Sequence, residues 1–449
     1  MALDRDSLGI LTRALERLDS RFASLPASEA ASCGGHRLQE VLLELAEKLA
    51  DNYPYFHPLY AGQMLKPPHP VARLAYSLAL YINPNNHALD GGRATSALEK
   101  EAVFEIAAML GWSEFLGHLC GGGTMANLEA LWVAGQRHPG KAIVASEQAH
   151  YTHSRISGVL QLPFEKIRSD SFGRMDLNAL EERAAKGEVG TVVATLGTTA
   201  TGSVDPLPGI LELAARFGFR VHVDAAYGGY FRLAGNLGEN AQNSFARIAE
   251  ADSVVIDPHK HGLQPYGCGC VLFRDPAVGR LYQHHSPYTY FSSPQLHLGE
   301  ISLECSRPGA AAAALWATQK LLPLEPGGEF ARGLERGREA ALKFWRAIAD
   351  GGRFVAPFAP ELDILVFLPG GTSPAEISAK SRRIFAAAAR RGLHLAVAEL
   401  PVRFWKDLGT QKGSENVTCL RSVLMKPEHL DWIERIMTLL LEANAEEQS

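Results

Sequence analysis

The feature that most constrains this chain is an alternation of strand-like and helix-like segments between residues 118 and 275. Short runs rich in β-branched residues predict strands at 142–145, 191–196, 220–224, 253–256 and 271–273. Helical spacing of apolar residues predicts helices at 126–136, 177–186 and 207–217. Because this alternation is typical of βαβ units, we expect an α/β fold with a mostly parallel sheet and helices on both faces.

The segments on either side predict two further parts. Two helices are expected within residues 4–52, and the apolar stripe of the second one packs either against the main body or against a second subunit. An irregular, aromatic-rich loop follows over residues 52–69. After a helix at 310–322, strands are expected at 354–357, 362–368, 393–397 and 417–424, and helices at 374–391 and 428–442. We therefore predict an N-terminal helical and loop segment (1–80), a large domain (81–325) and a smaller α+β C-terminal domain (326–449).

The composition excludes several classes of protein. A net charge of −5 over 449 residues gives no electrostatic footprint for nucleic acid or an anionic membrane. The N-terminus lacks the pattern of a signal peptide, and no apolar run approaches the roughly 18 residues of a membrane span. Six cysteines in such a long chain do not form a disulfide framework, and Cys268 and Cys270 lack the second pair that a zinc site needs. We expect a reduced, cytoplasmic protein without a metal.

Lys260 stands at the end of a predicted strand. Pro258 ends the strand 253–256, because proline fixes φ and has no N–H to donate. His259 and Lys260 therefore lie where open α/β sheets bind their ligands. Considered alone, Lys260 is either catalytic or an ordinary solvated lysine.

Three other strand ends carry residues that are ambiguous one by one. Gly121 to Thr124 opens a helix and is either a cup for phosphate or a packing turn. Asp224 is either a turn former or a partner of a ligand, and His150 is either a core histidine or a ligand contact. Together with Lys260 they form a set that pyridoxal 5′-phosphate (PLP) requires: a lysine for a Schiff base, an acid for the pyridinium nitrogen and a site for the phosphate.

Five motifs resemble those of the group II PLP-dependent amino acid decarboxylases, the family of the aromatic amino acid, tyrosine, histidine and glutamate decarboxylases. They are Gly-Gly-Thr-x-Ala-Asn127, Glu147-Gln-Ala-His150, Leu196-Gly-Thr-Thr199, His222-Val-Asp-Ala-Ala-Tyr227 and Asp257-Pro-His-Lys260. The resemblance covers roughly residues 50 to 320. It implies a fold-type I PLP enzyme, with a mostly parallel sheet of the seven-stranded type, that works as a homodimer with active sites at the interface.

The resemblance also assigns roles residue by residue. Lys260 resembles the lysine that forms the Schiff base, and Asp224 resembles the partner of the pyridinium nitrogen. His150 resembles the imidazole stacked on the cofactor ring, with Ala226 on the other face. The remaining cofactor contacts implied are Gly123, Thr124 and His259 at the phosphate, and Thr198 or Thr199 near the 3′-oxygen and the substrate.

The reaction implied is decarboxylation of an L-amino acid to its amine and CO₂, with the electrons of the broken bond passing into the cofactor ring. In the family a loop tyrosine protonates Cα, and here Tyr288 and Tyr290 are the candidates, each of which either donates the proton or simply packs. His261 stands where the family has tryptophan, and Arg307 either pairs with a substrate carboxylate or caps the next helix.

Other functions remain open from the sequence. The same cofactor serves aldehyde-releasing C–C lyases and aminotransferases, and a non-catalytic scaffold is a further alternative, against which the intact Lys260, Asp224 and His150 argue. The expected substrate is a small molecule, an L-amino acid. The aromatic-rich loop at Tyr55 to Met64, expected to shape the pocket, favours an aromatic side chain, with acidic ones still open.

Overall fold

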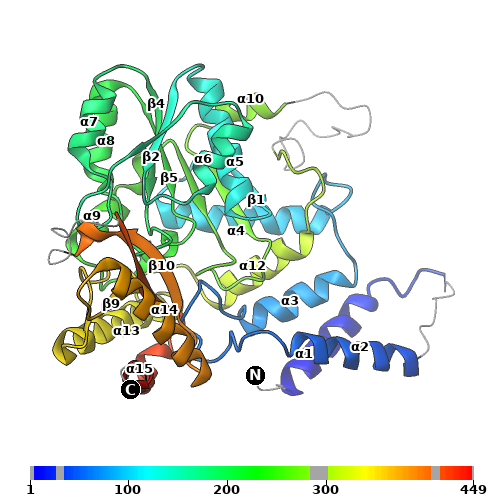
Figure 1. Cartoon of the computed structure of the whole chain (residues 1–449). Coiled ribbons are helices and arrows are strands. Elements are labelled where there is room, and N and C mark those ends of the chain that lie inside the picture. The colour runs from blue at the N-terminus through cyan, green and yellow to red at the C-terminus, as the bar shows by residue number, and fades with distance from the viewer. Residues whose placement is uncertain (1–4, 27–34, 284–301, 406–414, 447–449) are drawn as a thin grey trace.

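The computed structural model describes residues 5–26, 35–283, 302–405 and 415–446 (Figure 1). Its large domain is built on a seven-stranded sheet in the order β1-β7-β6-β5-β4-β2-β3. The strands are β1 (Leu116–Cys120), β2 (Ala142–Ser146), β3 (Phe164–Ile167), β4 (Val189–Thr195), β5 (Arg220–Asp224), β6 (Ser253–Ile256) and β7 (Gly269–Phe273).

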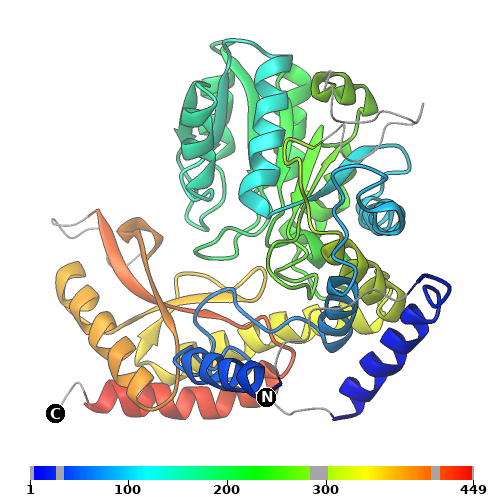
Figure 2. The ribbon, with the colours of Figure 1, turned by 90° about the vertical axis from the view of Figure 1, so that its right-hand side faces the viewer.

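The pairing of the strands fits the prediction of a mostly parallel sheet. β3, β2, β4, β5 and β6 pair in parallel, whereas β7 runs antiparallel to both of its neighbours, β6 and β1. Every residue of β2, β4 and β6 is buried, because helices cover both faces of the sheet (Figure 2). The helices of this domain are α4 (Arg93–Leu110), α5 (Gly123–Arg137), α6 (Thr152–Val159), α7 (Leu177–Ala184), α8 (Leu207–Phe217), α9 (Glu239–Ala246), α10 (Gly279–Tyr282) and α12 (Gly309–Leu321).

The C-terminal part forms a second, antiparallel sheet in the order β10-β11-β9-β8. Its strands are β8 (Phe354–Val355), β9 (Ile364–Pro369), β10 (Ala396–Pro401) and β11 (Asn416–Val423). Its helices are α13 (Glu329–Gly351), α14 (Pro374–Arg390) and α15 (His429–Glu446). α13, which the sequence analysis did not predict, leads from the large domain into this layer, and it packs Phe344 against Phe367 of β9 in the second core.

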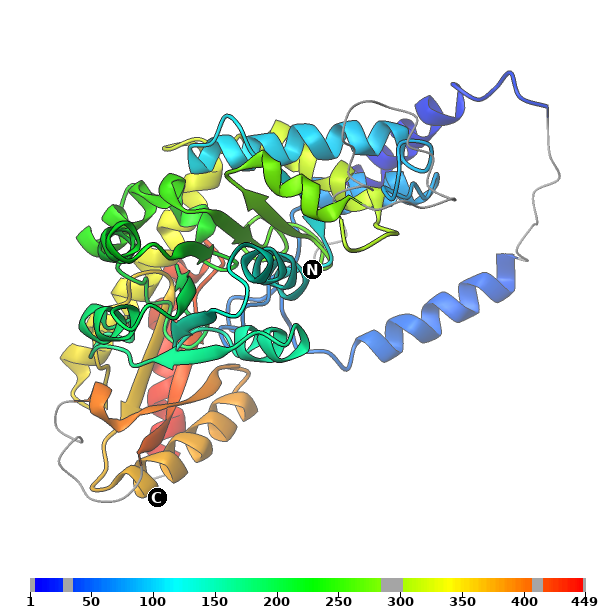
Figure 3. The same ribbon diagram turned by 90° about the horizontal axis from the view of Figure 1, so that it is seen from above.

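The N-terminal helices α1 (Arg5–Asp19) and α2 (Gly35–Leu49) precede α3 (Pro70–Leu80). α2 has no buried residue and stands away from the rest of the chain (Figure 3). Its apolar stripe therefore does not pack against the main body within one chain. The side chains left exposed are Leu38, Val41, Leu42, Leu43, Leu45 and Leu49.

Residues 52–69 form no helix and no strand longer than the single bridge between Tyr60 and His394. This agrees with the predicted ordered loop. None of the helices in the described part of the chain has the length and the apolar character needed to cross a membrane.

Candidate active site

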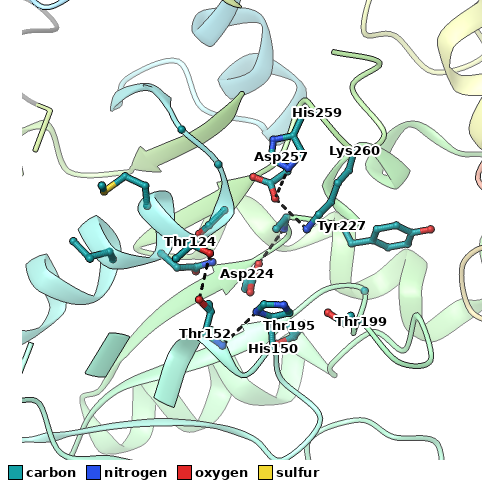
Figure 4. A pocket seen from close by; sticks show the side chains of 18 of the residues that line it. Thr124, His150, Thr152, Thr195, Thr199, Asp224, Tyr227, Asp257, His259 and Lys260 are labelled. Carbon is teal, nitrogen blue, oxygen red and sulfur yellow. Dashed lines mark hydrogen bonds and ion pairs between the residues drawn. The ribbon is translucent and has the colours of Figure 1, made fainter. Parts of the chain in front are cut away.

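A pocket of about 490 Å³ opens at the carboxyl ends of the parallel strands (Figure 4). Open α/β sheets place ligand sites at this edge because the loops that follow neighbouring parallel strands meet there. The lining comes from the segments after β1, β2, β4, β5 and β6. Of the predicted residues, it includes Gly123, Thr124, His150, Thr199, Asp224, Ala226, His259 and Lys260.

Asp224, the last residue of β5, is buried and faces this pocket. Its Oδ2 lies 2.8 Å from Nε2 of His153, and its Oδ1 accepts a hydrogen bond from the backbone N–H of Ala226 at 3.1 Å. Burial alone would raise the pKa of Asp224, but the hydrogen bond from His153 and the positive charges of His153 and Lys260 hold that pKa well below its usual range. The pocket therefore contains a permanent negative charge.

Lys260 follows β6 and directs its amine into the same pocket, where Nζ lies 3.0 Å from Oδ2 of Asp257 (Figure 4). Asp257 is 2% exposed, and its Oδ2 lies 3.6 Å from Nε2 of His259. Sequence reasoning assigned no role to Asp257, although it opens the Asp-Pro-His-Lys motif. One buried carboxylate thus holds both the lysine and the histidine at this strand end.

The glycine turn after β1 is shaped by close approaches. At Gly123, where α5 begins, an added Cβ would lie 2.6 Å from Oδ2 of Asp257, and Gly122 has a φ of 142°, which favours glycine. The N–H of Gly121 donates to Oε2 of Glu304 at 2.8 Å. This carboxylate shows that the turn accepts a negatively charged group at the start of α5, as a helix N-terminus favours.

His150 stands in the loop after β2, and its Nδ1 accepts a hydrogen bond from the N–H of Thr152 at 3.3 Å. Thr152 in turn donates from Oγ1 to Oγ1 of Thr124 at 3.4 Å. Burial lowers the pKa of His150, and the nearby Asp224 opposes this only in part. A neutral, flat imidazole is therefore presented to the pocket.

The two threonines after β4 differ in their surroundings. Thr199 lines the pocket, and its backbone carbonyl accepts a hydrogen bond from Nη2 of the buried Arg421 at 2.7 Å. Thr198 is not part of the lining, because its hydroxyl bonds to Oγ1 of Thr201 at 2.8 Å and to the N–H of Ser203 at 3.0 Å. Of the two candidates, Thr199 is thus the one whose side chain can meet a ligand here.

Arg307, for which the sequence left two roles open, lies outside the pocket lining. Arg307 is buried, with Nη1 2.6 Å from Oε1 of Glu99, and it donates to the carbonyls of Leu119 and Asn86. The helix after it has no side-chain cap, so in this structure Arg307 neither faces the pocket nor caps α12. Tyr288 and Tyr290 fall outside the described residues.

His261 points away from the pocket lining and is buried. Its Nε2 lies 3.2 Å from Oδ2 of Asp363, whose Oδ1 accepts a hydrogen bond from the hydroxyl of Tyr227 at 2.6 Å. Tyr227 lines the pocket, and His261 reaches it in two ways: through Asp363 and by an edge-on ring contact, with the two ring centroids 4.7 Å apart.

The residues present fit PLP. The glycine turn leaves room at the start of α5, and a charged carboxylate, a neutral imidazole and an amine line one cavity. Within the described part of the chain, Oγ1 of Thr195 and Nδ1 of His259 are buried without a hydrogen-bond partner, although both side chains line this pocket. Buried polar atoms are seldom left unpaired, so these two are available to a ligand. The fold and the site thus define a fold-type I PLP enzyme.

Comparison with known proteins specifies the family. The pyridoxal-dependent decarboxylase conserved domain matches residues 139–368. The L-tyrosine decarboxylase of Enterococcus faecium is 29% identical over 64% of this chain and 64% of its own length, slightly less than two thirds. A probable L-tyrosine/L-aspartate decarboxylase of Methanothrix thermoacetophila is 33% identical over 61% of this chain and 68% of its own length. The chain belongs to the pyridoxal-dependent decarboxylase family.

Solved structures agree on the fold. The Oryza sativa TDC structure with PLP and tryptamine has a TM-score of 0.78 at 17% identity and covers both chains completely. Mouse CSAD in its apo form has a TM-score of 0.77 at 20% identity, over 97% of this chain and 99% of that one. The predicted family, fold class, cofactor and enzyme class, a PLP-dependent carboxy-lyase acting on an amino acid, are confirmed.

Proposed function

We propose that this chain removes the α-carboxylate of an aromatic L-amino acid as CO₂ and releases the corresponding amine. The observation that carries this proposal is the convergence of Lys260, Asp224 and His150, from three different strand ends, on one pocket of about 490 Å³. The comparisons with tyrosine and aspartate decarboxylases support the reaction class.

Each residue then has a definite task. When bound, PLP supplies the ring that accepts the electrons of the bond to the carboxylate. Asp224 would hold a proton on the ring nitrogen, because His153 keeps its carboxylate charged. Lys260 would supply the amine that attaches the cofactor. His150 and Ala226 would provide packing surfaces for the ring, since both line the pocket.

The phosphate is expected at the glycine turn. Gly123 and Thr124 offer backbone and hydroxyl donors at the start of α5. His259 lies beside this turn, since a Cβ added at Gly122 would lie 3.1 Å from the His259 ring. We place the hydroxyl of Thr199 near the 3′-oxygen of the cofactor and the substrate, because Thr199 lines the pocket. The hydroxyl of Thr198 instead accepts a hydrogen bond from the N–H of Ser203 and so stabilises the loop after β4.

An aromatic substrate is favoured over an acidic one by the charges in the pocket. The described lining residues include the acids Asp224, Asp257 and Glu304 but no arginine, the residue best suited to a second carboxylate. The relatives named as tyrosine and aspartate decarboxylases leave both substrates to be compared.

The deciding experiment measures CO₂ release from a panel of L-amino acids with added PLP, and identifies the products. L-tyrosine and L-aspartate are the key pair, with D-tyrosine as a matched control. We expect CO₂ and an amine from an aromatic L-amino acid. An aldehyde or a keto acid without a matching amine would instead identify a C–C lyase, an aldehyde synthase or an aminotransferase, and would overturn the proposal.

We further propose a homodimer that works in the cytoplasm. The exposed apolar stripe of α2 supports the dimer, since burying six such side chains against a second copy removes them from water. The described cysteines are all free and four of them are buried, which suits a reducing compartment. Light scattering tests the dimer, and Leu42→Glu with Leu45→Glu should give a monomer; cell fractionation tests the location.

A further inference from the structure

A second pocket, of about 370 Å³, lies outside the active site. It is enclosed by the loop at residues 56–70, the start of α13 and residues 425–428 before α15. Leu263, Leu322, Phe330 and Leu334 form apolar walls, and Lys66, Lys426 and His261 bring polar groups into the same space. The proposed decarboxylation assigns no task to this pocket.

The two lysines are poorly paired. Lys426 is 5% exposed and donates from Nζ to the backbone carbonyl of Tyr60 at 2.6 Å. The half-buried Lys66 donates to the carbonyl of Met425 at 3.3 Å. An ammonium group has three N–H donors, so each amine has donors to spare. In the part of the chain that the structure describes, neither amine lies within 4.0 Å of a carboxylate oxygen.

His261 adds a third unsatisfied group. The ring is 2% exposed, and its Nδ1 has no hydrogen-bond partner among the described residues. Leaving one buried and one half-buried amine without counter-ions, and an imidazole nitrogen without a partner, costs free energy. A bound anion that meets the two amines, with a hydrogen-bonding group near the imidazole, removes that cost.

The edge of the pocket limits what can enter. Glu329 and Glu428 line it and are exposed. Two carboxylates at the mouth repel polyanions, while the apolar walls favour a ligand with an apolar body. The volume suits a small molecule rather than a peptide.

We propose that this pocket is a binding site for a small organic anion, whose carboxylate or phosphate group is held by Lys66 and Lys426 and whose apolar body packs against Phe330 and Leu334. The site is separate from the PLP pocket, and its existence does not depend on the reaction catalysed there.

The charge state of the lysines supports this site. Burial lowers the pKa of Lys66 to about 8, with Asp363 and Glu428 opposing, and lowers the pKa of Lys426 to about 7, helped by the charge of Lys66. A bound anion raises both pKa values, so binding takes up protons above pH 7 and weakens as the pH rises. The charged and titratable groups around the two amines are Asp363, Glu428, Glu329, His69, His261, His429 and Tyr60, whose ring centroid lies 5.4 Å from Nζ of Lys426.

The test is calorimetric titration of the PLP-loaded enzyme at pH 7 with benzoate and, separately, with inorganic phosphate. The loaded enzyme is used because its phosphate cup is already filled. We expect one binding event for at least one anion, weakened at least about tenfold by Lys66→Met or Lys426→Met. Lys343→Met is the matched control, since Nζ of Lys343 lies 3.0 Å from Oε1 of Glu434 on an exposed face. The two anions distinguish carboxylate from phosphate ligands.

Binding is measured without turnover, so binding of the same anion should persist in Lys260→Ala with added PLP even if the proposed reaction is wrong. The proposal is overturned if the wild-type enzyme binds neither anion at millimolar concentrations, or if both methionine variants bind as tightly as the wild type. Should those variants not fold, the wild-type pH series decides. The affinity for whichever anion binds must fall several-fold between pH 6.5 and 8.5 with measurable proton uptake, and binding that is independent of pH contradicts the site.

Discussion

Nε2 of His153 lies 2.8 Å from Oδ2 of Asp224, and both side chains are buried. His153 is not among the residues that line the PLP pocket. It therefore acts by positioning Asp224 and by keeping its carboxylate charged, rather than by touching the substrate.

Replacing His153 should change how the activity depends on pH. In His153→Leu the burial of Asp224 would be less well opposed, so the pKa of Asp224 should rise. We expect the acid limb of the kcat profile to move to higher pH and kcat at pH 7 to fall about 10- to 100-fold. His138→Leu, on a histidine outside the pocket, is the control, and an unchanged profile in His153→Leu would refute this role.

Lys260→Ala should abolish both colour and activity. Without its amine the chain cannot hold PLP covalently, so the dialysed protein should lose the cofactor's absorbance and CO₂ release should fall at least about 1000-fold. Lys343→Ala should retain both. A Lys260→Ala protein that stays yellow after dialysis and still releases CO₂ would show that another amine carries the cofactor.

Thr198 and Thr199 should separate stability from activity. Thr198→Val removes the hydroxyl that accepts from the N–H of Ser203 and takes one of two hydrogen-bond partners from Oγ1 of Thr201, so the free energy of unfolding should fall by about 1–3 kcal/mol. Thr199→Val should instead lower kcat/KM, with little change in the melting temperature, because its hydroxyl faces the pocket. Melting curves and kinetics on the same two variants give the answer, and the reverse result would exchange the two roles.

His222 should make stability depend on pH. Burial lowers its pKa to about 3, whereas an unfolded histidine has its ordinary value near 6.5. Between these values the unfolded chain binds one more proton, so the free energy of unfolding rises with pH by about 1.4 kcal/mol per pH unit. Denaturant titrations at several pH values from 5 to 6.5 give the unfolding free energy at each pH. In His222→Asn, the rise of this free energy per pH unit should be smaller by this amount. Equal slopes would mean that His222 is charged in the folded chain.

Tyr288 and Tyr290 lie outside the described residues, and kinetics must choose between them. If one protonates Cα, its phenylalanine variant should form amine at least about 100-fold more slowly. The other variant should stay within about threefold of the wild type. Two variants that both retain full activity would exclude both residues as the proton donor.

Local pattern was enough to predict most of the residues that meet in the candidate pocket. Strand ends are visible in the sequence because a buried β-branched run stops at a glycine, proline or polar residue, as it does before Lys260 and after β5. What the sequence did not reveal depends on contacts between distant segments. His153 meets Asp224 because α6 crosses near the end of β5, and Arg307 is held by Glu99 of α4.

The missed helix has a different cause. α13 contains glycines at 333 and 337 and is rich in charge, so its helical pattern is interrupted in the sequence. Gly337 is explained only by packing, since an added Cβ would lie 2.9 Å from the carbonyl of Leu424. Such a requirement is invisible until the two segments are seen together.

The placement of β7 has a consequence for how the enzyme matures. Among the strands that the structure describes, β1, which precedes the glycine turn, pairs only with β7, the last strand of the sheet to leave the ribosome. Gly269 at the start of β7 also packs on Gly122. A Cβ added at Gly269 would lie 2.5 Å from the carbonyl carbon of Gly122. A partly synthesised chain therefore has no complete phosphate cup, although its parallel strands are already present. Uptake of the coenzyme should thus coincide with the final closure of the sheet and should report that the domain has finished folding.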